Sequence, residues 1–350
     1  MTGMLKNPTH KPIIMEDLTY VDESLLFAGN VKVVIPKVAN CATCERLYKT
    51  MRNREKCDWE TQCRVNFTKP VQKVIEELIK GDDNLRQGTD KWLKTRETLS
   101  CSGSIAPALT GCGFPSQYEE FVTSRARARL NLAKIPTIKN DAMQWGIENE
   151  PRAFRRFVCE TGHFGISSPP MIYHPDHPDI AASADGVTLC GATIEIKCPY
   201  RESSLARRKV VPSQYFAQCF LQMACMESSQ HYFVTYSPQR TNGQDAKKAK
   251  LGPFCDILVI DKLSIFKHLR PVICGHIRRD VLTTITTIPA RNAEDVQKIV
   301  SVWFDKMLLP CILSAKIGIE AAMSVIERNE KEKVKFLETF VGDVMDIIFK

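Results

Sequence analysis

The segment 182–197 carries the residues whose types and spacing best suit chemistry. It reads ASADGVTLCGATIEIK, so Asp185 ends one predicted strand and Glu195 and Lys197 lie two residues apart in the next. In a hairpin-like pair of strands, Asp185 can stand beside Glu195. Side chains two apart on a strand point to the same face of a sheet, which puts Glu195 and Lys197 together. Two carboxylates and a lysine at one sheet edge suit a divalent cation and an oriented water. A solvated strand face gives the same alternation, so this interpretation depends on neighbouring segments.

Two further segments carry polar groups that could face this site. Glu150 lies in the run GIENEPRA, within a predicted helix, and offers a third carboxylate. Three glutamines recur every fourth residue and form a polar stripe on an otherwise apolar helix: Gln214, Gln218 and Gln222. A stripe that faces a buried site needs hydrogen-bonding partners. A stripe that faces solvent does not, and both interpretations remain open at this point.

Four of the fourteen cysteines form a cluster near the N-terminus. Their spacing is C-x2-C followed by C-x5-C, at Cys41, Cys44, Cys57 and Cys63. Four thiolates can hold zinc in a tetrahedron. The second pair is spaced more widely than in a standard zinc knuckle, so the sequence favours ordinary reduced cysteines over zinc.

The predicted elements place these residues in a mixed α/β arrangement. Apolar spacing predicts a long helix over 140–160 and another over 212–227. Runs rich in Ile and Val predict five strands, near 164–173, 180–188, 192–198, 230–237 and 254–261. This order predicts an α/β (α+β) core with a central mixed sheet flanked by helices.

Three regions follow from this pattern. Residues 1–66 have weak periodicity and are expected to form an irregular N-terminal extension. Residues 67–261 contain the predicted core. Residues 262–350 are expected to form three or four helices packed on that core.

Composition excludes several classes of protein. Apolar residues make up 44% of the 350 residues and charged residues 25%, which excludes a wholly disordered or collagen-like chain. The formal charge of +8 favours a polyanionic partner. The sequence contains no run of eighteen or more uncharged apolar residues, so it predicts no membrane-spanning helix. The first twelve residues lack the apolar core of a secretory signal, so we expect an intracellular protein.

Four motifs in this order resemble the lambda exonuclease family of PD-(D/E)XK nucleases, also called YqaJ-type viral recombinases or alkaline exonucleases. The resemblance runs from about Trp92 to Tyr236. The motifs are Trp92-x3-Arg96 with Leu99-Ser100-Cys101-Ser102, Gly146-x3-Glu150-x2-Ala153, Ser183-Ala184-Asp185-Gly186 with Glu195-Ile196-Lys197, and Tyr215-Phe216-Ala217-Gln218 with Gln222-Met223. Two departures stand out. Ala184 replaces the common proline, and the first motif is one residue short, which makes Ser100 or Ser104 alternatives to Ser102.

The resemblance implies a restriction-endonuclease-like core that binds Mg²⁺, one ion or two, with Mn²⁺ as a substitute. The implied ligands are Asp185, Glu195 and the backbone carbonyl of Ile196, with Glu150 serving a second metal. Lys197 would position the attacking water. Gln218 would hold Lys197 or the scissile phosphate.

The family's activity is degradation of linear double-stranded DNA from the 5′ end to 5′-mononucleotides, which leaves single strands for recombination. Arg96 and Ser102 would then hold the terminal 5′-phosphate. Five further arginines, in two basic segments, would follow the phosphate backbone: Arg125, Arg127, Arg129, Arg207 and Arg208. A surface cation is the alternative for Arg96, and a solvated charged face is the alternative for each basic segment.

The resemblance also implies partners: DNA ends, a single-strand annealing protein and a trimeric ring of this chain, in the nucleus or cytoplasm of an infected host cell. Three other functions remain open from the sequence. They are a broader alkaline nuclease that cuts circles or RNA, an iron–sulfur nuclease, and a non-catalytic DNA-binding recombination partner. The iron–sulfur class needs cysteines on both sides of the core, but the only tight cluster precedes it. The non-catalytic class would lack the acidic ligands, which are present.

Overall fold

A seven-stranded mixed sheet forms the centre of the chain. The computed structural model describes residues 21–26, 31–52, 67–80, 85–113, 115–132, 141–200, 208–238, 254–273 and 279–348. In spatial order, the strands are β1 (Val21–Leu26), β2 (Val31–Pro36), β3 (Gly165–Ser167), β6 (Gly186–Thr188), β7 (Thr193–Lys197), β8 (His231–Ser237) and β9 (Phe254–Ile260). Neighbours are antiparallel except β7 and β8, which are parallel. A separate pair is formed by β4 (Ile172–Tyr173) and β5 (Ala181–Ala182).

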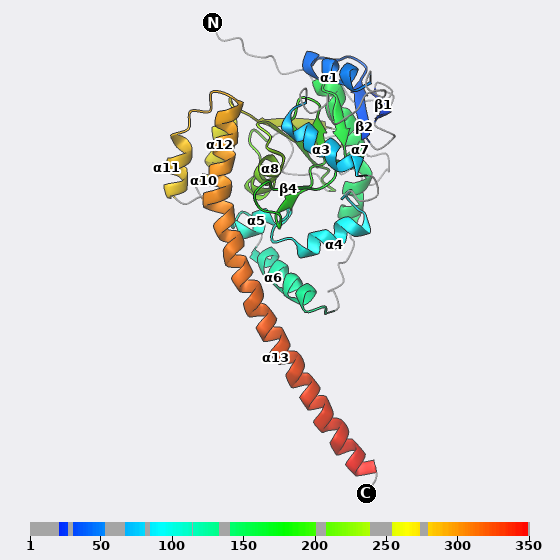
Figure 1. Cartoon of the computed structure of the whole chain (residues 1–350), viewed down its shortest axis with the longest axis vertical. Coiled ribbons are helices and arrows are strands. Elements are labelled where there is room, and N and C mark those ends of the chain that lie inside the picture. Colours follow the sequence, from blue (N-terminus) through cyan, green and yellow to red (C-terminus); the bar gives the residue numbers. More distant parts are fainter. Residues whose placement is uncertain are drawn as a thin grey trace, which may run out of the picture.

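Two long helices cover the sheet, which agrees with the predicted mixed α/β class (Figure 1). On one face, α7 (Asp141–Thr161) buries Phe154 and Phe157 in a cluster that includes Ile194 and Ile196 of β7. On the other face, α8 (Ser213–Met226) is almost wholly buried and contacts β7 and β8. Because side chains alternate along a strand, β7 turns its isoleucines toward α7 and its polar residues toward α8.

The described part of the N-terminal region is regular, where the sequence predicted an irregular segment. The hairpin β1–β2 joins the sheet because Val33 and Val34 of β2 pair with Ile166 and Gly165 of β3. The run VKVVIP is rich in β-branched residues, which fit a pleated, half-buried surface. Two helices follow, α1 (Ala42–Arg52) and α3 (Lys69–Ile79).

The remaining helices come from two stretches of the chain, and α8 packs against members of both. Between β2 and β3 lie α4 (Asp90–Thr98), α5 (Ala106–Leu109) and α6 (Pro115–Arg129), of which α5 contacts α8. After it come α10 (Ile265–Ile273), α11 (Arg279–Thr286), α12 (Ala293–Trp303) and α13 (Leu309–Ile348), with a π-helical turn over Phe304–Leu308. Trp303 meets Phe216 and Phe220 of α8 edge to face, which fixes α12 on the core.

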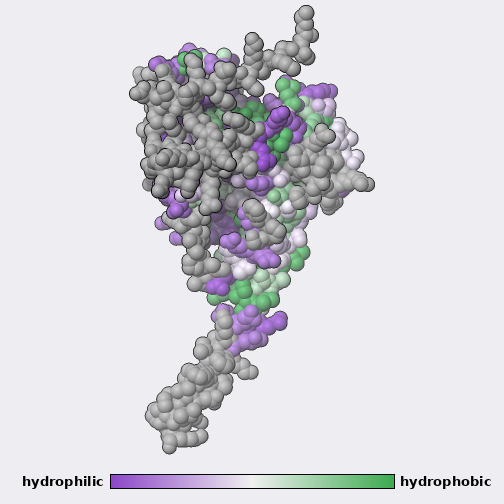
Figure 2. Space-filling model, turned by 180° about the vertical axis from the view of Figure 1, so that it is seen from behind, coloured by the Kyte–Doolittle hydropathy of each residue, from purple (hydrophilic) through white to green (hydrophobic). Residues whose placement is uncertain are grey.

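The last helix, α13, packs against α6 near its start and then extends away from the rest of the molecule (Figure 1). Apolar side chains are exposed along it at Leu313, Ile317 and Val325. Figure 2 shows apolar surface where the helix leaves the body. Within the described residues, Ala293–Glu332 is the one helical stretch long and apolar enough to span a membrane, which by itself is weak support for a span.

Candidate active site

The hairpin β6–β7 places Asp185 directly beside Glu195. Asp185 comes just before β6, and its backbone N–H donates to the carbonyl of Ile194 at 2.9 Å. Its carboxylate in turn accepts the N–H of Ile196 at 2.6 Å. Gly186 leaves room for this arrangement, since a Cβ there would lie 2.1 Å from the ring of Phe154. The predicted juxtaposition of the two carboxylates is therefore present, with Asp185 9% and Glu195 1% exposed.

Three donors hold the carboxylate of Glu195 on the α8 side of the sheet. Gln218 donates to Oε1 at 2.7 Å and Gln222 donates to Oε2 at 2.6 Å, while Lys197 forms an ion pair with Oε1. The Lys197 ammonium also lies 5.1 Å from the ring centre of Tyr215. The glutamine stripe thus faces the buried site rather than solvent at these two positions. Gln218 donates to Glu195 in this structure, and the role that the resemblance implies for it, to hold Lys197 or the scissile phosphate, stays a prediction.

Gln222 belongs to the fourth sequence motif, but the resemblance gave it no role. Its amide bridges Glu195 and the carbonyl of Ser183, the latter at 3.0 Å. Ser183 also accepts the indole N–H of Trp92 at 2.9 Å. The four-residue period of the glutamines was the available signal for Gln222. These bonds connect α4, α8 and the hairpin that carries the acidic residues.

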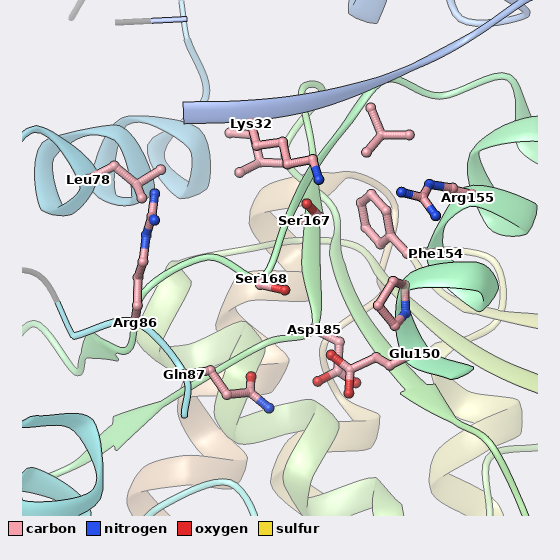
Figure 3. A pocket seen from close by; sticks show the side chains of 13 residues that line it. Lys32, Leu78, Arg86, Gln87, Glu150, Phe154, Arg155, Ser167, Ser168 and Asp185 are labelled. Atoms are coloured by element: carbon pink, nitrogen blue, oxygen red, sulfur yellow. The ribbon is translucent and has the colours of Figure 1, made fainter. Parts of the chain in front are cut away.

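Glu150 supplies the third carboxylate from α7. Figure 3 shows its carboxylate and that of Asp185 pointing toward one another, with Gln87 opposite them. Burial and the neighbouring charge of Glu195 raise the pKa of Glu150 to about 7. Burial, with the charges of Glu195 and Glu150, raises the pKa of Asp185 well above its usual value. The cluster therefore resists holding three negative charges unless a cation joins it.

The same carboxylates favour the charged form of Lys197. Burial alone would lower the pKa of its ammonium, but the charges of Glu195 and Asp185 outweigh that effect and raise the pKa. The lysine therefore stays protonated at neutral pH. In this state it can donate hydrogen bonds but cannot act as a base.

Two cavities meet at the carboxylates, and both are lined by Gln87, Glu150 and Asp185. The larger, of about 240 Å³, has basic side chains on its far side: Lys32, Arg86 and Arg155 (Figure 3). The other, of about 210 Å³, continues past Glu195, Ile196 and Lys197 to Arg96 and Ser102. The basic residues of the larger cavity were not predicted, because they come from separate segments that carry no shared motif.

Arg96 and Ser102 line the same cavity, as the predicted phosphate pocket requires. The Arg96 guanidinium stacks 4.3 Å from the ring centre of Trp92 and donates to the hydroxyl of Ser104 at 2.7 Å. Burial lowers the pKa of Arg96. The hydroxyl of Ser102 is buried without a hydrogen-bond partner among the described residues. The helix that follows, α5, has only four residues and begins after Ile105, so Ser102 does not cap it.

The other predicted DNA-binding arginines are dispersed. Arg125 is buried and donates to the backbone carbonyls of Leu99 and Arg96, so its donors support the end of α4. These two hydrogen bonds account for a buried guanidinium at this position, with no need for a phosphate contact. Arg127 is half-buried and Arg129 is exposed on the same helix. Arg208 is also exposed, whereas Arg207 lies outside the described residues.

The structure describes only two residues of the predicted cysteine cluster, Cys41 and Cys44. Cys57 and Cys63 lie outside the described residues. Cys41 and Cys44 lie beside His163 and Cys190, two residues that are distant in the sequence.

Comparison with known proteins gives one family match and a distant structural likeness. Residues 91–230 match the model of the YqaJ-like viral recombinase domain, which confirms the predicted resemblance over those residues. A crystal structure of an alkaline exonuclease, LHK-Exo, from Laribacter hongkongensis is 20% identical, with a TM-score of 0.39, and covers 69% of this chain and 98% of that chain. The structure of LHK-Exo in complex with dAMP is also 20% identical, with a TM-score of 0.41, and the match covers 70% of this chain and 99% of that chain. No curated protein matches the chain.

Proposed function

We propose that this chain, with its YqaJ-like viral recombinase domain over residues 91–230, is a metal-dependent nuclease that degrades linear double-stranded DNA from the 5′ end. The observation that carries the proposal is the convergence of Asp185, Glu195 and Lys197 in one cavity, which meets a second cavity at Asp185. A phosphodiester backbone can approach such a junction from either side. Basic residues in each cavity supply charge complementary to phosphate.

The residues at the junction fit Mg²⁺. Asp185, Glu150 and Glu195 offer carboxylate oxygens, the ligands that this hard cation prefers. Burial, together with the neighbouring negative charges, raises the pKa of Asp185 and of Glu150, so a cation bound among these carboxylates would favour their charged forms. Asp185, Glu195 and the Ile196 carbonyl would hold the metal, and Glu150 a second one. When bound, Mg²⁺ would neutralise phosphate charge and acidify a coordinated water.

The protein's own groups would position the reactants. Gln218 and Gln222 fix the orientation of the Glu195 carboxylate, so its oxygens keep their direction when DNA enters. The Lys197 ammonium, held against Glu195 and Tyr215, can donate to the attacking water and favour its deprotonated form. A lysine that remains protonated serves this electrostatic role better than that of a general base.

Arg96 and Ser102 would select the DNA end. Arg96 offers a planar fork that suits a terminal phosphate. The unpartnered hydroxyl of Ser102, buried in the same cavity, offers another donor. Because α5 is a single short turn, this pocket relies on the two side chains rather than on a helix dipole.

Digestion of three DNA substrates tests the proposal. The wild-type protein is given linear duplex with 5′-phosphate ends, the same duplex with 5′-hydroxyl ends, and a relaxed closed circle, each with Mg²⁺ or EDTA. We expect Mg²⁺-dependent release of mononucleotides from linear DNA, with a 5′-terminal label released before a 3′-terminal one, and an intact circle. Asp185→Asn is the matched inactive control.

Two outcomes would overturn parts of the proposal. Full activity of pure Asp185→Asn would remove Asp185 from the metal site. Rapid cutting of the circle would replace the exonuclease with a nuclease that needs no end.

A further inference from the structure

Four side chains from three separate segments converge at the turn of the β6–β7 hairpin, the end opposite Asp185. Cys41 stands just before α1 and Cys44 lies in its first turn, His163 follows α7, and Cys190 lies in the turn between β6 and β7. Their three sulfurs and one ring nitrogen all lie within 4.8 Å of one another. Cys44 is fully buried and the other three are half-buried. Such a set is typical of a structural metal centre.

Two of the distances between these atoms match those of a tetrahedral zinc site. The Nδ1 of His163 lies 3.6 Å from the sulfur of Cys44 and 3.6 Å from that of Cys190. With Zn–S bonds of about 2.3 Å and a Zn–N bond of about 2.0–2.1 Å, a tetrahedron separates sulfur and nitrogen by about 3.6 Å. The N–H of Cys44 also points at the sulfur of Cys41, at 3.5 Å.

Hydrogen bonding alone satisfies these groups poorly. One ring nitrogen carries either one lone pair or one hydrogen, so Nδ1 cannot bond well to two thiols at once. A cation between the three atoms removes this conflict, because each sulfur and the nitrogen then supplies a lone pair to the same centre.

The surrounding groups also fit a metal-bound histidine. The other ring nitrogen of His163, Nε2, lies 3.0 Å from the hydroxyl of Tyr232. A partner on Nε2 fixes the ring orientation and leaves Nδ1 free to bind metal. The sulfur of Cys190 has a similar partner in the hydroxyl of Thr188, at 3.2 Å.

The backbone brings the distant segments together at this point. Gly162 has a φ of 68° and ends α7, and its carbonyl accepts the N–H of Asn40 at 3.3 Å. A Cβ at Gly162 would lie 2.5 Å from Asn40, so only glycine permits this approach. The contact sets Cys41 next to His163.

We propose that Cys41, Cys44, His163 and Cys190 bind one structural Zn²⁺. Three thiolates and an imidazole leave no open position, so the metal would fasten segments together and not act on a substrate. It would join the N-terminal segment to the hairpin that carries the acidic residues. The proposal replaces Cys57 and Cys63 of the sequence pattern with two ligands from the core, and it does not depend on the nuclease function.

Metal analysis of the full chain tests the site. We expect wild-type protein, purified without chelator, to hold about one zinc per chain. Co²⁺ exchanged into the chain should give visible bands of a tetrahedral ion and sulfur-to-metal charge-transfer absorption. Wild-type protein that holds no zinc and takes up neither metal would overturn the proposal, and this result requires no variant to fold.

Single substitutions identify the ligands. Cys190→Ser and His163→Ala should lose the zinc and lower the melting temperature in zinc-containing buffer, because binding energy contributes to folding. Cys255→Ser, at a half-buried cysteine on β9, is the matched control and should keep the metal. Full zinc retention in Cys190→Ser and His163→Ala would also overturn the ligand assignment.

Discussion

Gln222→Met tests how strongly α8 controls the carboxylate of Glu195. The glutamine is fully buried. Its amide donates to Glu195 at 2.6 Å and to the Ser183 carbonyl at 3.0 Å. Its own carbonyl oxygen, Oε1, has no partner among the described residues. Methionine has a similar length and can fill the space, but it has neither the donors nor the oxygen.

The expected effect on stability is small because two contributions oppose each other. The charge-assisted bond to Glu195 contributes about 1.5–3 kcal/mol and the bond to Ser183 about 0.5–1.5 kcal/mol. Removing the buried, unpartnered oxygen returns about 1–3 kcal/mol. We therefore expect the free energy of unfolding, without metal, to fall by about 1 kcal/mol, and by at most about 3.5 kcal/mol. The effect on activity has no such compensation, since loss of a partner of a metal ligand lowers metal affinity or rate about 10–100-fold.

The assay follows cleavage of a linear duplex across a Mg²⁺ titration, with urea unfolding measured in parallel. Gln214→Met, on the same helix but outside the lining of both cavities, serves as the matched control. We expect the Gln222 variant to need more Mg²⁺ or to cut more slowly, and the control to match the wild type. If the Gln222 variant keeps the wild-type rate and Mg²⁺ dependence, the reasoning about Glu195 is wrong.

Three further predictions follow from the site. Without metal, the stabilisation from protonated Glu150 is complete below about pH 4.5 and lost as pH rises through its folded-state pKa of about 7. The raised pKa of Asp185 acts in the same direction, so Mg²⁺ should raise the melting temperature more at about pH 8 than at about pH 5. Equal shifts at both pH values would contradict this. Arg96→Ala should slow digestion of 5′-phosphorylated duplex about ten- to hundred-fold more than that of the 5′-hydroxyl form, and Arg96→Lys should recover part of the loss. Equal slowing of both substrates would make Arg96 a general backbone contact. Gly186→Ala should lower the free energy of unfolding by about 1–3 kcal/mol, because its Cβ would meet a ring 2.1 Å away, whereas Gly146→Ala, in open space, should be neutral or stabilising. An unchanged urea midpoint for Gly186→Ala would contradict this, because it would show that α7 can shift away from the added Cβ at no cost in stability.

Local periodicity was sufficient to predict the parts of the fold that are long and regular. The spacing of Phe154, Phe157 and Val158 predicts the helix seen as α7, and the run of Ile and Val predicts β7 to β9. The strands at the N-terminus were missed for a different reason. Only β2 of this hairpin pairs with the rest of the sheet, and its partner β3 is three residues long and lies far along the chain, so no local pattern indicates the contact.

At the site, too, the residues placed by local patterns could be predicted and those brought together from distant segments could not. Asp185 and Glu195 could be placed together because a hairpin register and a two-residue period determine their positions. Lys32 and Arg86 could not be predicted, because β2 and the loop after α3 meet only in the tertiary structure. His163 was likewise missed as a partner of Cys44, from which 119 residues separate it.

The attachment of β2 to β3 also affects how the chain folds during synthesis. Val33 must wait for Ile166, about 130 residues later, and at about 5–20 residues per second the ribosome needs roughly 7–26 s to supply it. The β1–β2 hairpin itself can close within microseconds. During the interval, β2 presents one strand edge of β-branched residues with no partner, a surface that promotes aggregation. A nascent chain stalled between these two points would therefore be a target for chaperones that cover exposed strand edges.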